Sequence, residues 1–234
     1  IVRLSREKVM LLNRLLIKAV APVPKIEKFK TYLFVAPHPD DIEIAVGSTV
    51  ARLAREGKDV YYLVCTDGRF GTEDENMSPE TLVKIRRDEQ LASGVKEVRF
   101  LPFEDGGMYD EVALRIEIAK VIAEIKPDVV IGPDHKLYPE SHPDHLRVGE
   151  AVSKAYFMCS NVNMMKSVGA TQIAKPTVLA YYFTGKPNRF VKITKKDFEK
   201  TKAAYACFVS QCPPPDNGKS LMLYMRLKVR LNGF

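Results

Sequence analysis

From residue 31 onward, short apolar segments alternate with longer segments in which apolar residues recur at helical spacing. A short apolar segment bounded by turn residues is typical of a buried strand. Repeated alternation of strand and helix is typical of a parallel sheet with helices on both faces. The pattern therefore predicts an α/β protein with a Rossmann-like, doubly wound, mostly parallel sheet. We expect the strands at residues 32–36, 60–65, 98–101, 128–131, 177–183 and 190–193.

Residues with helix-capping character mark the predicted helices. Ser78-Pro79 supplies a cap followed by proline at the first helical position, and Gly94 is placed to end that helix. Asp110 is expected to cap the next helix, which ends before Pro127. Further helices are expected at about residues 42–56 and 144–158, from Thr194 onward and after the three prolines at 213–215.

The chain is predicted to have three parts: an N-terminal helical extension at residues 1–30, a main domain at 31–212 and a C-terminal helical segment at 213–234. Residues 6–20 form an apolar helical pattern flanked by basic residues, which suits a membrane surface or a contact with another subunit. Packing against the core is the commoner position of such a helix, and it is our expectation. A homo-oligomer stays open.

The formal charge of +7, from 36 Lys and Arg against 29 Asp and Glu, raises the question of a polyanionic partner. Basic residues are interleaved with acidic ones, as in Arg86-Arg87-Asp88-Glu89, and we interpret this pattern as a solvated surface. We therefore expect no nucleic-acid partner. Near the C-terminus, basic residues alternate with apolar ones at 226–231, where they could meet an acidic surface.

The four cysteines form no CxxC motif, so reduced thiols are the simplest expectation. No apolar segment reaches the length of a membrane span, and the N-terminus lacks an apolar region followed by a small-residue cleavage site. The sequence therefore predicts a cytoplasmic protein with no transmembrane segment. Neither GxGxxG nor GxxxxGK[ST] is present, so no nucleotide is indicated.

All four histidines follow predicted strands: His38 follows the first, and His135, His142 and His145 follow the fourth. They include two similar tetrapeptides, His38-Pro39-Asp40-Asp41 and His142-Pro143-Asp144-His145. In the common strand order 3-2-1-4-5, strands one and four are neighbours, and ligands bind beyond their carboxyl ends. Both tetrapeptides are therefore expected to face one crevice.

Imidazole and carboxylate groups in one crevice indicate a catalytic divalent metal. A catalytic zinc takes three protein ligands and keeps a position for water, whose pKa falls from about 15.7 to roughly 7. A nearby carboxylate can accept a proton, and a further imidazole can protonate a leaving amine. The alternative is that Asp40, Asp41 and Asp144 cap helices and that each His-Pro pair is only a tight turn. Two such motifs after neighbouring strands favour a site.

The two motifs resemble those of the LmbE-like (PIG-L) zinc deacetylases, and their context is most similar to that of the archaeal diacetylchitobiose deacetylases. The likeness extends from about residue 30 to 212 and includes Thr66-Asp67-Gly68, Arg86-Arg87-Asp88-Glu89 and Tyr181-Tyr182. It implies a metal-dependent hydrolase with one Zn²⁺ per chain, although other divalent transition metals suit the same ligands. The implied reaction removes the N-acetyl group from a small amino sugar or glycoconjugate of the diacetylchitobiose or N-acetylglucosamine type.

The resemblance also implies roles for individual residues. The metal ligands would be His38, Asp41 and His145. Asp40 would be the general base, and His142, oriented by Asp144, would stabilise the oxyanion or protonate the amine. The positions that would contact substrate or hold its loop are Arg86, Asp105 and Asp67, for which the alternative is a surface ion pair, a loop cap or a turn residue.

The sequence departs from the family pattern at three positions. Ile42 replaces the usual Glu of the first motif, Pro37 precedes His38, and Phe208 stands where many members carry a histidine. None of these three residues is an implied ligand, so the departures bear on substrate and assembly more than on the metal. Several alternatives stay open. The chain could be a related amidase acting on a thiol glycoside or glycolipid, or a phosphate or peptide hydrolase with the same metal ligands. It could also be a non-catalytic sugar-binding protein on the same fold, or a basic surface protein that binds phospholipid or nucleic acid through its terminal helices.

Overall fold

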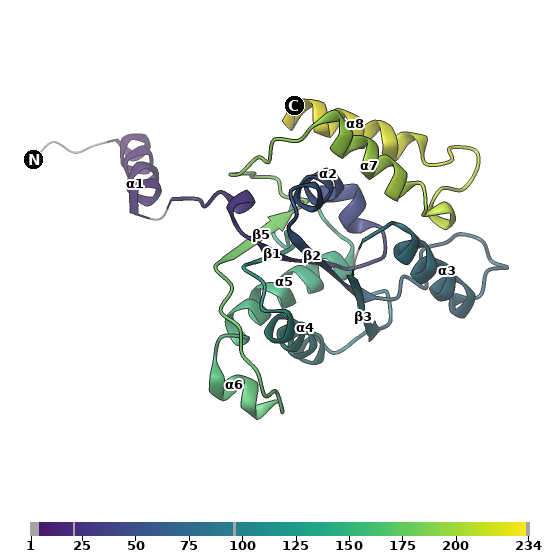
Figure 1. The fold of residues 1–234 in the computed structure, drawn as a ribbon, viewed down its shortest axis with the longest axis horizontal. Helices are drawn as coiled ribbons and strands as arrows, with labels where there is room; N and C mark the ends of the chain where they lie inside the picture. Colours follow the sequence, from purple (N-terminus) through teal and green to yellow (C-terminus); the bar gives the residue numbers. More distant parts are fainter. Residues whose placement is uncertain (1–4, 21, 96, 233–234) are drawn as a thin grey trace, which may run out of the picture.

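The structure, a computed structural model, describes residues 5–20, 22–95 and 97–232. At its centre lies a parallel sheet with the strand order β3-β2-β1-β4-β5 (Figure 1). The predicted α/β, doubly wound fold is confirmed, and so is the strand order. The strands are β1 Thr31–Ala36, β2 Asp59–Thr66, β3 Glu97–Phe103, β4 Val129–Pro133 and β5 Val178–Tyr182.

Helices cover both faces of this sheet because alternate strand residues point to opposite sides. In β1, Leu33 and Val35 join the apolar cluster on the side of α4 and α5, whereas Tyr32 and Phe34 join the cluster on the side of α2. The α-helices are α1 Arg6–Val20, α2 Asp41–Arg55, α3 Pro79–Ala92, α4 Glu111–Ile125, α5 Pro143–Met158, α6 Val162–Ser167, α7 Lys195–Tyr205 and α8 Lys219–Asn232. Two 3₁₀ helices, η1 Ile26–Lys28 and η2 Val209–Gln211, complete the description.

The strand expected at residues 190–193 is wrong, because these residues have no regular structure. The carbonyl of Lys192 accepts a hydrogen bond from the Arg52 side chain instead of pairing with a strand. Ile193 is buried in a third apolar cluster with Phe198 of α7 and Met225 of α8. The apolar alternation at this point therefore belongs to a loop that covers α2, and α8 packs on the same body as α7.

Helix α1 stands away from the sheet (Figure 1). Its large apolar side chains are exposed, each by at least 41%: Val9, Met10, Leu11, Leu12, Leu15, Leu16, Ile17 and Val20. The expectation that this helix packs against the core is therefore wrong for the chain as described. Among the described residues, no helix has both the length and the apolar character that a membrane span requires.

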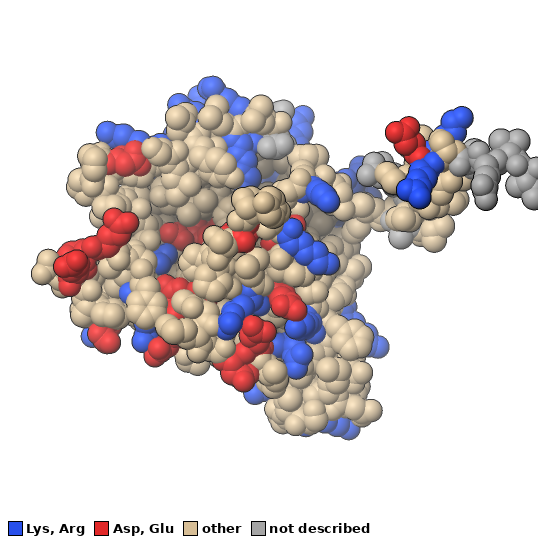
Figure 2. Space-filling model, turned by 180° about the vertical axis from the view of Figure 1, so that it is seen from behind, with Lys and Arg blue, Asp and Glu red and all other residues tan. Residues whose placement is uncertain are grey.

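Basic and acidic side chains are interspersed over the face shown in Figure 2. The interpretation of Arg86-Arg87-Asp88-Glu89 as a solvated surface is nevertheless wrong at two positions, because Arg86 is only 4% exposed and Glu89 only 9%. Together with Gln90 they lie at helical spacing on one side of α3, so that this helix buries a polar face. Glu89 accepts hydrogen bonds from the main chain and hydroxyl of Ser210, which ties α3 to η2.

Candidate active site and metal centre

The carboxyl ends of β1 and β4 lie side by side and carry the two histidine motifs. The loop after β1 is held by Thr66, whose N–H and hydroxyl both donate to the carbonyl of Pro37. The ring centroids of His38 and His145 are 5.5 Å apart, and those of His38 and His142 are 4.7 Å apart. The structure thus brings both motifs into one site, as the strand order predicts.

The side chains of His38, Asp41 and His145 form the first candidate metal group, with ligand atoms within 4.8 Å of one another. Nδ1 of His38 lies 3.2 Å from one carboxylate oxygen of Asp41, and Nε2 of His145 lies 3.4 Å from the other. Each imidazole also has a carboxylate at its second nitrogen: Asp105 for His38 at 3.1 Å, and Glu140 for His145 at 3.0 Å. This arrangement is usual for metal-ligating histidines, so the donor set fits a divalent ion.

Hydrogen bonds between imidazoles and carboxylates have the decisive effect on the pKa values of this group. Burial lowers the pKa of His38, but hydrogen bonds to Asp105, Asp144 and Asp41 outweigh it and hold that pKa well above its usual value. His145 follows the same pattern through Asp41 and Glu140. Burial raises the pKa of Asp41, yet the two histidines hold it well below its ordinary value. The group therefore pairs a carboxylate with two imidazoles of raised pKa, so a bound cation would compete with protons for both rings.

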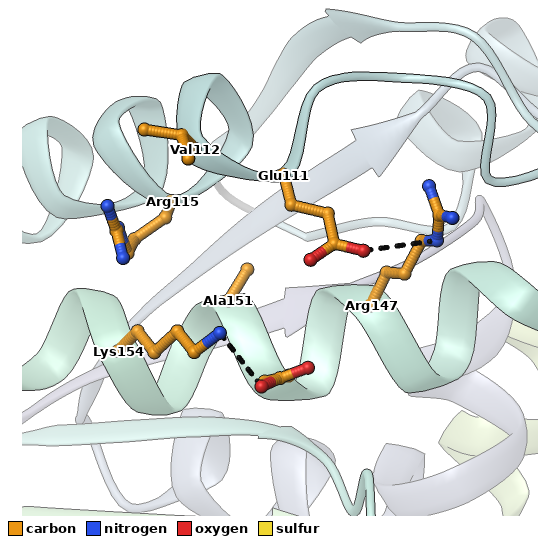
Figure 3. A pocket seen from close by; sticks show the side chains of 7 residues that line it. Glu111, Val112, Arg115, Arg147, Ala151 and Lys154 are labelled. Atoms are coloured by element: carbon orange, nitrogen blue, oxygen red, sulfur yellow. Dashed lines mark ion pairs between the residues drawn. The ribbon is translucent and has the colours of Figure 1, made fainter.

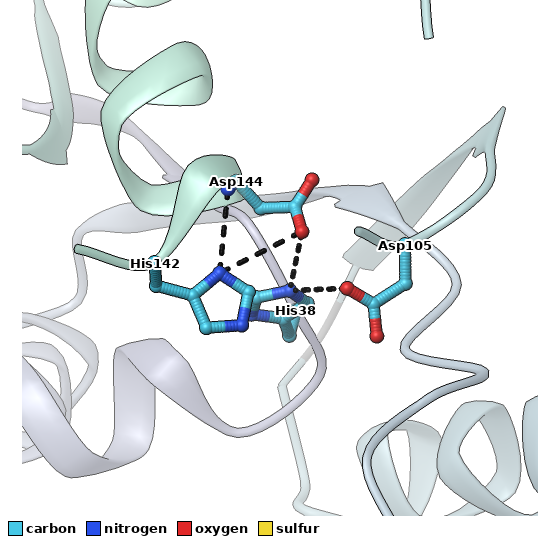
Figure 4. A group of neighbouring side chains, drawn as sticks. All are labelled: His38, Asp105, His142 and Asp144. Carbon is cyan, nitrogen blue, oxygen red and sulfur yellow. Dashed lines mark hydrogen bonds and ion pairs between the residues drawn. The ribbon is translucent and has the colours of Figure 1, made fainter. Parts of the chain in front are cut away.

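A second group of potential ligands consists of His38, Asp105, His142 and Asp144 (Figure 4). Asp144 is fully buried, and its two carboxylate oxygens accept the main-chain N–H groups of Gly106 and Gly107 at 2.8 and 3.1 Å. Because Asp144 is already satisfied by main-chain donors, we interpret this group as a hydrogen-bond network that orients His38. Glycine suits both donor positions, since their φ angles are +95° and +71°.

His142 occupies the N-cap of α5, where its Nδ1 accepts the main-chain N–H of Asp144 at 3.3 Å. A neutral imidazole that accepts at one nitrogen donates at the other, so Nε2 of His142 carries the proton. Burial lowers the pKa of His142, and the charges of His38 and His145 lower it further. This side chain is therefore a neutral hydrogen-bond donor that lines the cavity described below.

Asp40 precedes α2 in a left-handed conformation, with a φ angle of 98°, and its side chain makes no capping hydrogen bond. The alternative that Asp40 is simply a helix cap is therefore wrong. Burial raises the pKa of Asp40 to about 7, although the Arg86 guanidinium, 3.4 Å from Oδ2, lowers it. A buried carboxylate whose pKa lies near neutrality suits a general base.

Arg86 reaches the site from α3 and holds two loops. Its Nη2 donates to the carbonyl of Pro39 at 2.7 Å, and its Nη1 donates to that of Gly68 at 3.2 Å. A Cβ atom at Gly68 or Gly71 would lie within 2.5 Å of Nη1, so both glycines leave room for the guanidinium. Arg86 is therefore a buried member of the site and not a surface ion pair.

A cavity of about 350 Å³ opens beside these groups. Its lining includes His38, Asp40, Arg86, Asp105 and His142, which sequence reasoning had named. It also includes Phe70, Gly106 and Gln211, which sequence reasoning had not named. The available signal for Phe70 and Gly106 was their place in the loops after β2 and β3. For Gln211 it was the position three residues after Phe208, where many family members carry a histidine.

Asp67 lies outside the described lining of the cavity and holds a loop, the second of the two roles that the resemblance allows. Its carboxylate pairs with the Arg69 guanidinium at 2.8 Å and accepts the main-chain N–H groups of Arg69 and Asp105. It therefore joins the loops after β2 and β3. Glu140, the partner of His145, was also missed by sequence reasoning, although it begins the Glu-Ser-His-Pro-Asp-His segment.

A smaller cavity of about 50 Å³ lies between α4 and α5 (Figure 3). Two ion pairs border it, Glu111 with Arg147 at 3.4 Å and Glu150 with Lys154 at 2.8 Å. All four side chains are 38–48% exposed, and pairs this exposed contribute little to stability or binding. The histidine site is therefore the better candidate for function.

The family model for GlcNAc-PI de-N-acetylase (PIG-L) matches residues 33–156, more than half of the chain. The chain belongs to the PIG-L family. Deacetylases of this family are hydrolases of amide bonds and depend on a metal, and the described His and Asp group could hold one. The resemblance stated from the two motifs is therefore confirmed.

Individual relatives of this PIG-L protein have names that specify acetylated sugars. Diacetylchitobiose deacetylase from Thermococcus kodakarensis is 36% identical over 192 residues, which cover 79% of this chain and 70% of the relative. A 1D-myo-inositol 2-acetamido-2-deoxy-α-D-glucopyranoside deacetylase from Kineococcus radiotolerans is 30% identical and matches 67% of this chain, but only about half of its own length, 53%, is covered. The solved structure of N,N′-diacetylchitobiose deacetylase from Pyrococcus horikoshii has a TM-score of 0.85 at 30% identity and covers 99% of this chain and 89% of that one.

Proposed function

We propose that this PIG-L protein is a zinc-dependent deacetylase that hydrolyses the N-acetyl group of an N-acetylglucosamine-containing sugar of the diacetylchitobiose or monosaccharide type. The observation that carries the proposal is the convergence, beside one cavity, of a His-Asp-His donor set and an uncapped buried carboxylate, Asp40. The names of the relatives from Thermococcus kodakarensis and Pyrococcus horikoshii support the substrate class.

In this proposal His38, Asp41 and His145 hold one zinc ion, and Glu140 and Asp105 orient the two imidazoles from behind. When bound, the metal would polarise the acetamide carbonyl and lower the pKa of a water molecule. The same donor set also suits iron(II), cobalt and manganese. The choice of metal is therefore tested by its effect on acetate release.

Asp40 is the proposed general base. It faces the cavity, and its raised pKa gives it affinity for a proton taken from the attacking water near neutral pH. The Arg86 cation lowers the pKa of Asp40 and so favours its ionised form. Arg86 and Asp105 also line the cavity, where they can bind sugar hydroxyls, while Asp67 fixes the loop that carries Asp105.

His142 is proposed to donate its Nε2 hydrogen toward the developing oxyanion and then to the amine that leaves. Asp144 contributes through its main-chain N–H, which holds Nδ1 of His142. The unpaired state of all four cysteines supports the expected cytoplasmic location. The expected partner is the small amino sugar.

The test is acetate release by the purified protein from N-acetylglucosamine, diacetylchitobiose, an acetylated thiol glycoside and a glycolipid, each with zinc and with chelator. We expect release from the first two, abolished by chelator, and a loss of roughly 10²–10⁴-fold in Asp40→Asn with its zinc retained. Sugar binding without acetate release would instead indicate a non-catalytic sugar-binding protein. Full activity of Asp40→Asn would remove Asp40 as the base.

A further inference from the structure

The side chain of Gln90 on α3 contacts the main chain of Asp40 from behind the site. Gln90 is 1% exposed, and its Oε1 accepts the N–H of Asp40 at 3.1 Å. Its Nε2 donates to Glu43 Oε1 at 3.0 Å and to Ser93 Oγ at 3.2 Å. Gln90 lies outside the described lining of the cavity, so its influence on chemistry acts through other residues.

The orientation of the Gln90 amide is determined by its partners. An N–H group can only donate, so the amide oxygen must face Asp40, and the amide nitrogen then faces the acceptors Glu43 and Ser93. A flipped amide would place two donors against each other at Asp40 and leave its oxygen against the Glu43 carboxyl. Because a serine hydroxyl can donate as well as accept, it is Glu43 and not Ser93 that holds the amide in the one orientation that can accept from Asp40.

Gln90 and Arg86 both bind the peptide group that precedes Asp40. Arg86 lies four residues before Gln90 on the same side of α3. The carbonyl of Pro39 and the N–H of Asp40 belong to the same peptide group. Arg86 binds the carbonyl at 2.7 Å, and Gln90 binds the N–H at 3.1 Å. Two side chains on one face of α3 thus hydrogen-bond to the carbonyl and to the N–H of the 39–40 peptide group. Together they fix the plane of that peptide.

Fixing this peptide determines where the Asp40 carboxylate points. Asp40 has a φ angle of 98°, a left-handed value that residues other than glycine rarely adopt. A change in this angle rotates the Cα–Cβ bond relative to the peptide plane, so a fixed peptide plane and a fixed φ together hold the direction of the side chain. The Asp40 side chain makes no capping hydrogen bond, and its ion pair with Arg86, 3.4 Å from Oδ2, comes from the same face of α3.

We propose that Gln90 is a positioning residue that aims the Asp40 carboxylate into the cavity by holding the N–H of the 39–40 peptide. This inference rests on the proposed function, in which Asp40 is the general base. A glutamine suits the position because one planar group must accept from Asp40 and donate to Glu43. Loss of the amide would leave metal and substrate contacts in place but would move the base.

The test compares Gln90→Met, which keeps the length of the side chain but lacks the acceptor, with Ser93→Ala as matched control. Ser93→Ala removes one partner of the amide and leaves its bond to Asp40. We expect kcat for Gln90→Met to fall roughly 10- to 100-fold with KM and metal content unchanged, because a small displacement of a reacting group has effects of this size. Ser93→Ala should keep kcat close to that of the unaltered protein.

A second comparison asks whether Gln90 acts through Asp40. In the Asp40→Asn background the base is already lost, so Gln90→Met should cause no further fall in kcat. The same fold loss in both backgrounds, or a kcat for Gln90→Met close to the unaltered value, would overturn the positioning role. If Gln90→Met fails to fold, Gln90→Asn serves, because its shorter side chain withdraws the oxygen, and an unchanged kcat in it would also overturn the role.

Acetate release by the unaltered protein tests the proposed function separately from the role of Gln90. If the unaltered protein releases no acetate from any of the four substrates, the function and the role of Gln90 are both overturned. If it releases acetate and Asp40→Asn abolishes the release, the function stands, and the Gln90→Met result alone decides the positioning role.

Discussion

Two effects act on the pKa of Asp40 in opposite directions. Burial raises that pKa from 3.8 to about 7, and the Arg86 guanidinium 3.4 Å away lowers it. A general base acts in its ionised form, so kcat/KM rises with pH through the pKa of the base. The acid limb of the pH profile therefore reports the balance between the two influences.

Replacing Arg86 with glutamine removes the cation and leaves the burial. We expect the pKa of Asp40 to rise further, so that the acid limb of kcat/KM moves to higher pH by roughly one to three units. The measurement is the pH profile of acetate release between pH 4.5 and 9. Arg86→Lys keeps the charge and serves as control, with its limb expected near that of the unaltered protein. A limb that stays in place in Arg86→Gln would show that Asp40 is not the titrating base.

Single residues differ in how far the sequence alone predicts them. His38, Asp41 and His145 could be predicted to meet because the strand order places the ends of two strands together. Glu140 and Gln90 could not, since nothing in their local sequence shows that they face a histidine or a main-chain N–H from a distant segment. Buried polar partners of this kind depend on the packing of α3 and the loop before α5.

At the scale of elements, the glycine pair in the loop after β3 supports the start of α5. The φ angle of Gly107 is +71°, and a Cβ atom there would lie 2.7 Å from Pro143, the first residue of α5. Its N–H also donates to Asp144. The close approach of loop and helix therefore requires glycine at this position.

Gly107→Ala should disturb both the backbone and the site. We expect a loss of roughly 2–4 kcal/mol in the free energy of unfolding and a clear fall in kcat, because the Asp144 network orients His38. Gly169→Ala is the matched control: its φ angle is +75°, but a Cβ atom there meets nothing within 4 Å. The Gly169→Ala variant should lose only about 1–2 kcal/mol in its free energy of unfolding and should keep its kcat. Urea unfolding and acetate release check both variants, and equal losses in the two would contradict the argument.

Element boundaries were predictable where the signal is local. Ser78, Asp110 and Thr194 each accept a main-chain hydrogen bond at the start of a helix, as their sequence context predicts. The strand expected at 190–193 failed because alternation of apolar and polar residues also fits a loop with one buried side. The contact of Ile193 with α7 and α8 and the hydrogen bond from Arg52 to the Lys192 carbonyl distinguish the two, and both are tertiary.

At the scale of the whole molecule, the candidate metal centre joins segments that lie about a hundred residues apart. Asp41 begins α2, whereas His145 lies in the first turn of α5, and the two helices lie on opposite faces of the sheet. Carboxylates contact the rings of His38 and His145 and raise the pKa values of both. A bound metal would compete with protons for these rings and tie the two helices across the sheet edge.

Metal binding should therefore stabilise the fold, and the stabilisation should grow with pH. The pKa values of His38 and His145 are raised, so protons compete with the metal increasingly as pH falls, and binding releases protons. At a free zinc concentration about 100 times the dissociation constant, the linkage contributes about 2.7 kcal/mol to the free energy of unfolding. We expect zinc to raise the melting temperature more at pH 8 than at pH 6, with chelator reversing the effect. His145→Ala should abolish most of the shift, and an equal shift in that variant would place the ion elsewhere.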